Sequence, residues 1–531
     1  MTNNHKAIIE DGKAVLGIEL GSTRIKCCLI DESKTPFISG EFEWQNQLVD
    51  GIWTYAINDI WEGLQKSYAD LVQNVQMTYQ VPLRNLKALG ISAMMHGYLV
   101  FDEGDQLLVP FRTWRNCISS EAANYLTKEF NYNIPERWSI AHFYQAVLNN
   151  ETHVSNVAFM TTLSGYIHWQ LTGKKVLGVG DASGMFPIND QTHNYDEKML
   201  SRMDELLAEK NLSNKIEAIL PKVLLAGELG GYLTEEGAKR LDTLGQLEAG
   251  IPLCPPEGDA GTGMVATNTI SQKQGNVSAG TSIFAMFVLE QALKNVYPEI
   301  DIVTTPDGSM VAMVHGNNCS TDINNWIRIF DEFAKLMGYE VTKEELYEKL
   351  FTHSLNADPD AGGLLNYGYY SGEPLSGVID GRPLMLFHPN ADFNLANFMQ
   401  SHLFSSFSVL SLGMNILTTK EKVAIDKVFA HGGLFKTEAI AQKALATVLD
   451  KPVSVMNTAG EGGAWGIALL ADYLTYAEQG MTLPEYLAKF VFEALEEKVI
   501  TVGKNEREGY LAYFEQYQQA LPLAQQASRY I

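Results

Sequence analysis

Two segments that lie far apart in this chain of 531 residues share one pattern, and this repetition limits the fold more than any other feature. In the first segment, apolar runs at 14–20 and 25–30 flank the polar residues 21–24. In the second, strand-like runs at 276–279 and 283–289 flank a similar polar tip. Short apolar runs around a small polar turn are typical of a β-hairpin. We therefore predict two related hairpins, one in each half of the chain.

The tips of the two predicted hairpins are Gly21-Ser22-Thr23-Arg24 and Gly280-Thr281-Ser282. Their repetition at a distance of about 260 residues indicates two versions of one folding unit. The length of the chain also fits more than one domain, since about 100 to 200 residues usually form one. We predict an N-terminal domain over 1–265 and a C-terminal domain over 266–531.

Helical and strand patterns alternate along the chain. Apolar residues recur at helical spacing over 58–75, which predicts a helix with one buried face. Further on, a strand at 428–430, a helix capped by Thr437 and, after Pro452, a strand at 453–455 form a predicted β-α-β unit. This alternation favours an α/β architecture in both halves. No low-complexity linker separates the halves, so we expect a broad interface with a cleft between them.

The hairpin tips suit the binding of an anion. Gly, Ser and Thr offer backbone N–H groups and hydroxyls without bulky side chains, and Arg24 and Lys26 lie near the first tip. A plain turn is the alternative for either tip alone, but two matched tips favour a polyphosphate held by both. The net charge of −24 argues against nucleic acid as a partner, so any phosphate must be held locally. No Gly-Lys pair is followed by Ser or Thr, which excludes a P-loop.

Two further features combine glycines with positions suited to chemistry. Asp259 lies among glycines just before a predicted helix, where its carboxylate can face a cleft; capping that helix is the alternative role. Gly432 and Gly433, and the glycine-rich segment 460–466, each precede an apolar helix. Glycine at a helix N-terminus lets a nucleotide approach the backbone, although close packing of helix on strand explains it equally well.

The cysteines and the apolar runs indicate a reducing, aqueous setting. The five cysteines form no C-x-x-C pair, so zinc sites and disulfides are not expected. No apolar leader opens the sequence, and no run approaches the roughly 20 apolar residues that span a bilayer. We expect a cytoplasmic protein that binds neither membranes nor nucleic acid. The sequence leaves the oligomeric state open, with a homodimer among the alternatives.

Taken together, these segments resemble the FGGY family of carbohydrate kinases over nearly the whole chain. The segments that carry the resemblance stand in the family's order, at 16–26, 171–173, 181–184, 258–263, 275–282, 431–433 and 459–471. The resemblance implies a two-domain actin-like ATPase (ribonuclease H-like) α/β fold with a central cleft. It also implies ATP and Mg²⁺ as cofactors and a small sugar as the phosphate acceptor.

The resemblance assigns roles to individual residues. Asp259 matches the family's catalytic base. The ATP and phosphate contacts fall on the hairpin tips and the glycine-rich turns: Gly21, Ser22, Thr23, Arg24, Lys26, Gly280, Thr281, Ser282, Gly432, Gly433 and Gly462. Glu19 stands where the family's first hairpin usually has an Asp that helps to hold Mg²⁺ and its waters. The extra methylene moves the carboxylate roughly 1.5 Å further out, and Mg²⁺ tolerates little distortion of its octahedral shell.

Two segments of the N-terminal half resemble sugar contacts of the family. Residues 91–97 are similar to the Met-His-Gly segment of xylulokinases, which implies that Met95 and His96 touch the sugar beside Asp259. Residues 111–116 occupy the place of the family's Trp-Asn-Asp-x-Arg motif in a changed polar order, and the implied contacts are Trp114, Arg115 and Asn116. Because rearranged polar partners decide specificity, L-ribulose is an alternative to xylulose.

The expected activity is ATP-dependent phosphorylation of a xylulose-type ketopentose at its terminal 5-hydroxyl, with Asp259 as general base and Mg-ATP as phosphate donor. L-ribulose, another ketose or a polyol is the alternative acceptor. Two other classes of protein share some of these features. An actin-like or Hsp70-like mechanical ATPase has the hairpins but does not need the Met-His-Gly segment, and a non-catalytic sugar-binding regulator fits the departure at Glu19.

Overall fold

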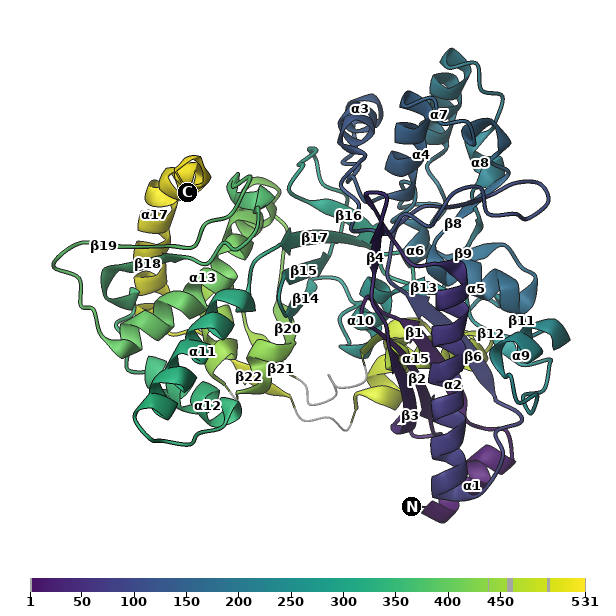
Figure 1. The fold of residues 1–531 in the computed structure, drawn as a ribbon, viewed down its shortest axis with the longest axis horizontal. Helices are drawn as coiled ribbons and strands as arrows, with labels where there is room; N and C mark the ends of the chain where they lie inside the picture. Colours follow the sequence, from purple (N-terminus) through teal and green to yellow (C-terminus); the bar gives the residue numbers. More distant parts are fainter. Residues whose placement is uncertain (1, 438, 456–461, 494–496, 531) are drawn as a thin grey trace. The chain divides into compact units, whose positions relative to one another are not determined.

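The structure is a computed structural model, and it describes residues 2–437, 439–455, 462–493 and 497–530 (Figure 1). The chain forms two compact units. Unit 1 contains residues 1–270, 302–311 and 460–494, and unit 2 contains residues 271–301, 312–459 and 495–531. Each unit is built around one main β-sheet with helices packed on it.

The sheet of unit 1 contains both strands of the first predicted hairpin. Its strands are β1 (Val15–Leu20), β2 (Arg24–Ile30), β3 (Pro36–Glu43), β6 (Ala88–Ala93), β11 (Gly231–Tyr232), β12 (Pro252–Leu253) and β13 (Glu257–Gly258). They run in the order β11-β12-β6-β1-β2-β3, and β13 pairs with β6. β1 and β2 pair antiparallel, with Glu19 opposite Lys26, and β1 pairs parallel with β6. The first predicted hairpin is therefore confirmed.

The sheet of unit 2 repeats this topology. Its strands are β14 (Gln274–Ala279), β15 (Ile283–Val288), β16 (Asp301–Thr304), β17 (Met310–Gly316), β20 (Lys427–His431), β21 (Val453–Val455) and β22 (Lys498–Ile500). They run in the order β16-β17-β15-β14-β20-β21-β22. β14 and β15 form an antiparallel hairpin, and β14 pairs parallel with β20, as β1 does with β6. The second hairpin and the prediction of two related units are thus confirmed.

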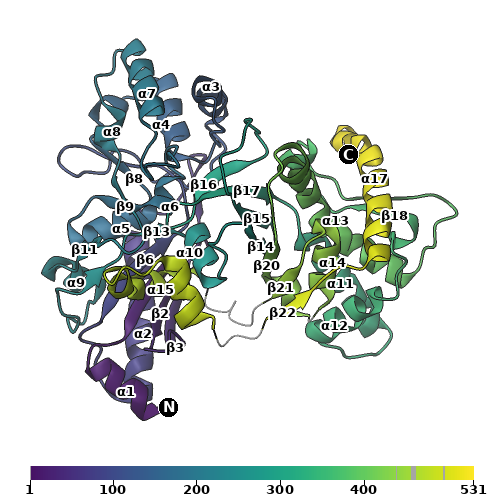
Figure 2. The same cartoon turned by 180° about the vertical axis from the view of Figure 1, so that it is seen from behind.

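Helices cover both faces of the unit 1 sheet. The helices of unit 1 are α1 (Thr2–Glu10), α2 (Ile57–Tyr79), α3 (Ser120–Phe130), α4 (Ser139–Leu148), α5 (Leu163–Thr172), α6 (Val179–Ala182), α7 (Glu197–Glu209), α8 (Ile216–Ile219), α9 (Glu235–Leu241), α10 (Asp259–Ala266), α15 (Gly462–Ala477) and α16 (Leu483–Tyr486). α2, which includes the predicted helix over 58–75, packs on β2 and β3. α10 and α15 lie on the opposite face, as the two views show (Figures 1 and 2).

Unit 2 contains α11 (Ser320–Leu336), α12 (Lys343–Ser354), α13 (Leu395–Asn415), α14 (Ile440–Leu449) and α17 (Lys504–Gln526). The short strand pairs of the molecule are β4 (Gln47–Val49) with β5 (Ile52–Thr54), β7 (Leu99–Phe101) with β8 (Phe159–Thr161), β9 (Val176–Gly178) with β10 (Lys222–Leu224), and β18 (Leu364–Tyr367) with β19 (Leu384–Phe387). Both units thus combine strands and helices, as predicted for an α/β architecture, although consecutive strands β1–β5 and β14–β17 interrupt the alternation.

The predicted β-α-β unit near the end of unit 2 forms, but its helix begins later than predicted. β20 and β21 pair parallel, and α14 connects them. Thr437 does not cap α14, because residues 433–436 form a short 3-10 turn that ends at Thr437. The residue that precedes α14 is Ala439, whose backbone has a φ of 68°. Thr437, the predicted cap of the helix, therefore ends the turn that follows β20.

Apart from the boundary, which lies at 270 and not at 265, the compact units and the predicted domain ranges differ in two segments, because residues 302–311 and 460–494 pack with unit 1. The second segment carries α15, which packs on β1 and β6 where Gly17 and Gly90 are partners across the two strands. A methyl group added at Gly17 would lie 2.0 Å from the carbonyl oxygen of Ala464. Only glycine at this position allows the helix backbone to rest directly on the sheet.

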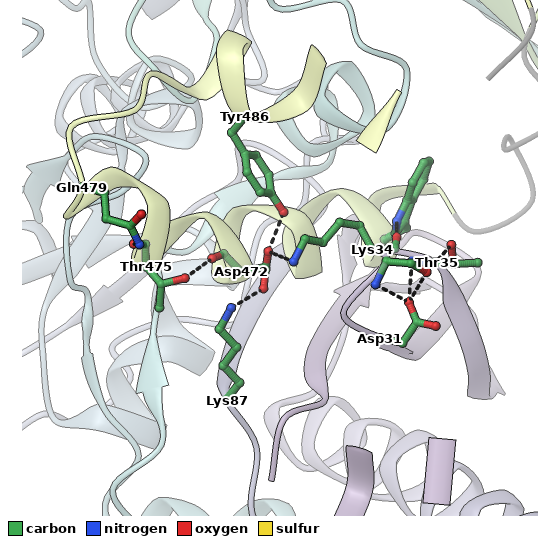
Figure 3. A network of polar contacts seen from close by, with 10 residues as sticks. Asp31, Lys34, Thr35, Lys87, Asp472, Thr475, Gln479 and Tyr486 are labelled. Atoms are coloured by element: carbon green, nitrogen blue, oxygen red, sulfur yellow. Dashed lines mark hydrogen bonds and ion pairs between the residues drawn. The ribbon is translucent and has the colours of Figure 1, made fainter. Parts of the chain in front are cut away.

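A buried ion network holds the far end of α15 to unit 1 (Figure 3). Asp472 on α15 accepts from Lys34 Nζ and Lys87 Nζ, each at 2.7 Å, and from the hydroxyl of Tyr486 at 2.7 Å. Asp472 and Lys34 are only 2% and 5% exposed at their side chains. Burial alone would raise the pKa of Asp472, but the charges of the two lysines outweigh it and lower the pKa below its ordinary value.

All five cysteines are free, and four of them are buried. Within the described residues, no group of His, Cys, Asp and Glu forms a cluster of three or more suited to a metal ion. No helix in the described part of the chain has both the length and the apolar character needed to cross a bilayer.

We expect Asp472→Asn to lower the free energy of unfolding of unit 1 by about 3 to 5 kcal/mol, because it leaves the buried Lys34 and the half-buried Lys87 without their charge partner. The matched control is Glu62→Gln, which breaks the exposed ion pair with Lys66 and should cost less than about 0.5 kcal/mol. Urea unfolding followed by tryptophan fluorescence measures this, since seven of the eight tryptophans lie in unit 1. Equal effects of the two variants would contradict the anchoring role.

Candidate active site

Asp259 lies where the carboxyl ends of three strands of unit 1 meet. β13 pairs parallel with β6, so that Glu257 stands opposite Ser92 and Gly258 opposite Ala93, and α10 begins at the next residue. Gly258, and not Asp259, is the N-cap of α10, so the alternative role of Asp259 as a helix cap is wrong. Its Oδ1 accepts a hydrogen bond from the backbone N–H of Met95 at 3.3 Å. Ligands commonly bind at this edge of an α/β sheet.

Four carboxyl groups gather around this edge, and each has a raised pKa. The pKa rises to about 7 for Glu19, 7 for Asp181, 8 for Glu257 and 6 for Asp259, mainly because burial disfavours the charged form. The charge of Asp259 raises the pKa of Glu19 further. Asp181 and Glu257 are fully buried, whereas Glu19 and Asp259 keep some contact with solvent. Only the latter two are therefore accessible to a ligand.

Asp181 and Glu257 connect the site to its surroundings, and the sequence analysis did not assign them a role at the site. Glu257 accepts from the backbone N–H groups of Gly180 at 3.2 Å and Asp181 at 2.9 Å. Asp181 accepts from the hydroxyl of Thr162 at 2.7 Å and from that of Ser164. The available signal was proximity in the sequence, since Glu257 on β13 lies two residues before Asp259, where α10 begins.

Glu19 is the last but one residue of β1 and points at the N-terminus of α15. Its Oε2 accepts from the backbone N–H of Ala464 at 3.2 Å, and a methyl group added at Gly463 would lie 2.4 Å from Oε1. The charge of Asp259 makes ionisation of Glu19 more costly, so the two carboxylates lie close enough to interact. Mg²⁺ is commonly held by one or two carboxylates, with water and phosphate completing its shell. The residues present therefore fit a Mg²⁺ ion that arrives with a phosphate ligand.

His96 has one defined tautomer. Its ring Nδ1 lies 3.1 Å from the carbonyl oxygen of Gly184, which accepts only, so Nδ1 carries the hydrogen. Burial, helped by the charge of Arg137, lowers the pKa of His96 to about 3. At neutral pH the ring is uncharged and Nε2 is a hydrogen-bond acceptor. Met95 and His96 are 5% exposed each, and they follow the carboxyl end of β6 beside Asp259.

The three predicted sugar contacts of the 111–116 segment lie in a loop bound to β5. Asn116 pairs through its side-chain amide with the backbone N–H and carbonyl of Trp53, each at 2.8 Å. The guanidinium of Arg115 stacks on the Trp53 ring at 4.2 Å. Trp114 donates from Nε1 to Ser22 Oγ at 3.2 Å, which brings this loop to the tip of the first hairpin. The amide of Asn116 is thus used by the backbone.

The predicted phosphate residues of the first hairpin form a short turn between β1 and β2. The backbone N–H of Gly21 donates to the carbonyl of Arg24 at 3.0 Å, and the carbonyl of Thr23 accepts from the N–H of Trp44 at 3.1 Å. Arg24 forms exposed ion pairs with two carboxylates of β3, and the charge of Lys26 lowers the pKa of Glu19. The charge of Lys26 therefore acts on Glu19, whereas Arg24 is directed toward β3.

The predicted phosphate and adenosine residues of unit 2 also lie together. The carbonyls of Gly280 and Thr281 accept from the first N–H groups at the start of α11, at 3.1 and 2.9 Å. Gly432 has a φ of 112°, and a methyl group there would lie 2.3 Å from the carbonyl oxygen of Ala279. The glycine turn after β20, which includes Gly433, thus packs directly on the strand that leads to Ser282.

Gly462 is the first residue of α15 in unit 1 and lies beside Glu19, since a methyl group added there would be 3.8 Å from Oε2. Residues 459–461 of the same glycine-rich segment lie outside the described residues. The assignments of all these residues to ligands stay predictions.

We expect the folded state of unit 1 to lose stability as the pH rises from about 5 to 8. The pKa of Glu257 is raised to about 8, so in this range the folded chain keeps a proton that the unfolded chain has released. Glu257→Gln should reduce the loss of unfolding free energy between pH 5 and pH 8 by on the order of 3 kcal/mol. It should also cost stability at pH 5, because its NH₂ group cannot accept from a backbone N–H. Urea unfolding at pH 5, 6.5 and 8 measures both effects, and an unchanged slope would contradict the assignment.

Comparison with known protein families identifies both halves of the chain. A model of the N-terminal domain of the FGGY family of carbohydrate kinases matches residues 14–265. A model of the C-terminal domain of the same family matches residues 275–474. Together the two matches cover most of the chain.

Individual relatives are distant in sequence. The chain is 22% identical over 375 residues to the gluconokinase of Bacillus subtilis, covering 68% of each protein. It is 20% identical over 297 residues to the xylulose kinase of Staphylococcus xylosus, covering 52% of this chain and 55% of that one.

Solved structures are similar over nearly the full length. A ligand-bound xylulose kinase from Lactobacillus acidophilus has a TM-score of 0.78 at 17% identity, covering 98% of this chain and all of that one. A gluconate kinase from the same organism has a TM-score of 0.77 at 17% identity, with the same coverage. At such identities the likeness establishes the fold and leaves the substrate open.

Proposed function

The chain belongs to the FGGY family of carbohydrate kinases, and from that premise we propose that it transfers the γ-phosphate of ATP to the terminal 5-hydroxyl of a ketopentose. Membership of the family makes the chain an ATP-dependent sugar kinase with the two-domain α/β fold of actin-like ATPases, as the sequence predicted. The ketopentose, the position of transfer and the roles of single residues are the proposal.

The observation that carries the proposal is the position of Asp259. Its carboxylate stands at the carboxyl edge of the sheet, keeps some contact with solvent and has a pKa raised to about 6. A general base works best when its pKa lies near the working pH. At neutral pH Asp259 is ionised, yet basic enough to take a proton from a sugar hydroxyl as its oxygen attacks phosphorus.

The rest of the chemistry is positioning and charge. The γ-phosphoryl group passes between two oxygens in line, so the protein mainly holds the reactants and neutralises charge. In this proposal the hairpin tips supply backbone N–H groups, with the hydroxyls of Ser22 and Thr281 beside them. Mg²⁺, when held by Glu19 directly or through water, would offset the negative charge of the phosphates.

The sugar is recognised, in this proposal, by Met95 and His96 next to the base. Because Nδ1 of His96 donates to Gly184, Nε2 offers an acceptor, which pairs with a hydroxyl and not with a carboxylate. That chemistry favours a neutral polyhydroxy sugar such as xylulose. L-ribulose and other ketoses or polyols present hydroxyls in the same way and are the alternatives, whereas gluconate brings a carboxylate.

A panel of acceptors tests the proposal. D-xylulose, L-xylulose, L-ribulose, D-ribulose, xylitol and gluconate are each offered with Mg-ATP, and ADP and sugar phosphate are measured together. We expect one ketopentose to be phosphorylated, with the product's phosphate on its 5-hydroxyl by NMR. ATP hydrolysis that no acceptor stimulates would favour a mechanical ATPase, binding of a sugar without turnover would favour a regulator, and turnover of gluconate alone would contradict the ketopentose assignment.

We expect Asp259→Asn to lower kcat for the best acceptor by at least ~10²-fold, because the base is lost. Binding of a non-hydrolysable ATP analogue and the thermal midpoint should persist, since the amide keeps the shape and can still accept from Met95. In the parent protein kcat/KM should fall below about pH 6 as Asp259 takes up a proton, and the variant should lack this step. Near-normal turnover by the variant would overturn the role of Asp259.

We expect Glu19→Gln to raise the Mg²⁺ concentration needed for half-maximal activity more than it raises KM for the sugar, because the lost charge acts on the metal. The pKa of Glu19 is raised to about 7, so the uncharged variant should also unfold at a higher temperature at pH 8. An unchanged Mg²⁺ titration together with raised stability would mean that Glu19 serves only to seat α15.

A further inference from the structure

Three aromatic side chains hold the tip of the first hairpin. Trp44 donates from Nε1 to the carbonyl of Gly21 at 2.7 Å, and Tyr55 donates from its hydroxyl to the carbonyl of Ser22 at 2.5 Å. Trp114 donates from Nε1 to Ser22 Oγ at 3.2 Å. The rings of Trp44 and Tyr55 also stack at 4.2 Å. We call Trp44, Tyr55 and Trp114 the aromatic bracket.

The aromatic bracket determines which way the tip presents its donors. In a trans peptide the carbonyl and the following N–H point in opposite directions. Because the carbonyl of Gly21 points at Trp44 and that of Ser22 points at Tyr55, the N–H groups of Ser22 and Thr23 point away from the bracket. The indole of Trp114 takes one acceptor position of the Ser22 hydroxyl and leaves its hydrogen to donate in another direction. The three hydrogen bonds from the aromatic bracket thus direct three donors of the tip away from it: the N–H groups of Ser22 and Thr23 and the hydroxyl of Ser22.

The same bracket is joined to the predicted sugar loop by two routes. The first is direct, because Trp114 is itself a residue of that loop. The second runs through Trp53, whose carbonyl accepts from the N–H and the hydroxyl of Thr113, each at 3.1 Å, and whose backbone pairs with Asn116. Tyr55 follows Trp53 by two residues and reaches the hairpin tip. A displacement of the sugar loop would therefore disturb two hydrogen bonds at the tip. One is the bond from Tyr55 to the carbonyl of Ser22, and the other is the bond from Trp114 to the hydroxyl of Ser22.

We propose that Trp114 and Tyr55 are positioning residues that make the phosphate-binding geometry of the first hairpin depend on the sugar. This inference rests on the proposed function, since it takes the loop at 113–116 as a sugar contact and the tip as a phosphate contact. A sugar that orders the loop orders the bracket, and the bracket aims the N–H groups of Ser22 and Thr23. Without sugar the tip holds the phosphates less well, which limits wasteful hydrolysis of ATP.

The coupling is measurable as a ratio of affinities. Calorimetry gives the dissociation constant of a non-hydrolysable ATP analogue with and without the sugar that the acceptor panel identifies, at saturating sugar. For the parent protein we expect the sugar to tighten the analogue by about 5- to 150-fold, the usual range of coupling between two sites. By linkage the analogue tightens the sugar by the same factor.

Two variants isolate the bracket. Trp114→Phe removes the N–H donor and keeps an aromatic ring, and Tyr55→Phe removes only the hydroxyl that binds Ser22. In both we expect the coupling factor to fall to below about 2 while sugar-free analogue binding changes less than about 2-fold. Sugar affinity itself should hold in Tyr55→Phe, because Tyr55 is 2% exposed and gives its hydroxyl to the hairpin.

The matched control is Trp61→Phe. In the parent protein, Trp61 of the same unit donates from its indole N–H to the hydroxyl of Tyr166 at 3.1 Å. The variant removes this donor and leaves the contacts of the hairpin unchanged. It should lose a similar amount of stability and keep the full coupling factor. This comparison separates positioning from a general loosening of unit 1.

The outcomes distinguish this inference from the proposed function. A parent protein that phosphorylates its sugar while both variants retain the full coupling factor would overturn the inference and leave the proposed function standing. Absence of coupling in an active parent protein would do the same. A parent protein that phosphorylates no acceptor would contradict the proposed function, and this inference with it. Loss of coupling in Tyr55→Phe alone supports the inference even where Trp114→Phe fails to fold.

Discussion

The site of unit 1 depends on the direct packing of α15 against the backbone of its neighbours. A methyl group at Gly17 of β1 would lie 2.0 Å from the carbonyl of Ala464, and one at Gly466 would lie 2.0 Å from the carbonyl of Thr262 on α10. Backbone therefore meets backbone on both sides of the helix, and any side chain at these glycines would force the elements apart. The same contact brings Ala464 to Glu19 and holds α10, which begins at Asp259. The ion network of Asp472 keeps the other end of the helix in place.

This packing buries carboxyl groups in surroundings where their ionisation is costly. Glu19, Asp181, Glu257 and Asp259 all have raised pKa values, so each contributes less to folding above its ordinary pKa than an exposed carboxyl does. The cost is the usual one for an active site, where activity is gained at the expense of stability. Asp259 becomes more basic, and a Mg²⁺ ion that binds the folded chain would return some of the lost stability.

The first hairpin shows how a polar tip becomes specific. Its composition offers several N–H groups and hydroxyls, but a flexible Gly-Ser-Thr turn can present them in many directions. In the structure, donors from Trp44, Tyr55 and Trp114 take the carbonyl and hydroxyl oxygens of the tip, which leaves the N–H groups with one orientation. A single hydrogen bond also orients the hydrogen-bonding groups of His96. Because Nδ1 donates to the carbonyl of Gly184, only Nε2 can accept.

The sequence by itself determined the two hairpins, the repeated α/β unit, the family and the position of Asp259, because these follow from local periodicity and from motifs that lie within a few residues of each other. It did not determine that 302–311 and 460–494 return to unit 1, that Glu257 and Asp181 stand behind Asp259, or that Trp114 touches Ser22. It also put the cap of α14 at Thr437, where a short turn ends instead. Each of these depends on contacts between residues tens to hundreds of positions apart. Only tertiary packing brings such residues together, because the free energy of burial and hydrogen bonding belongs to the pair and cannot be read from either residue alone.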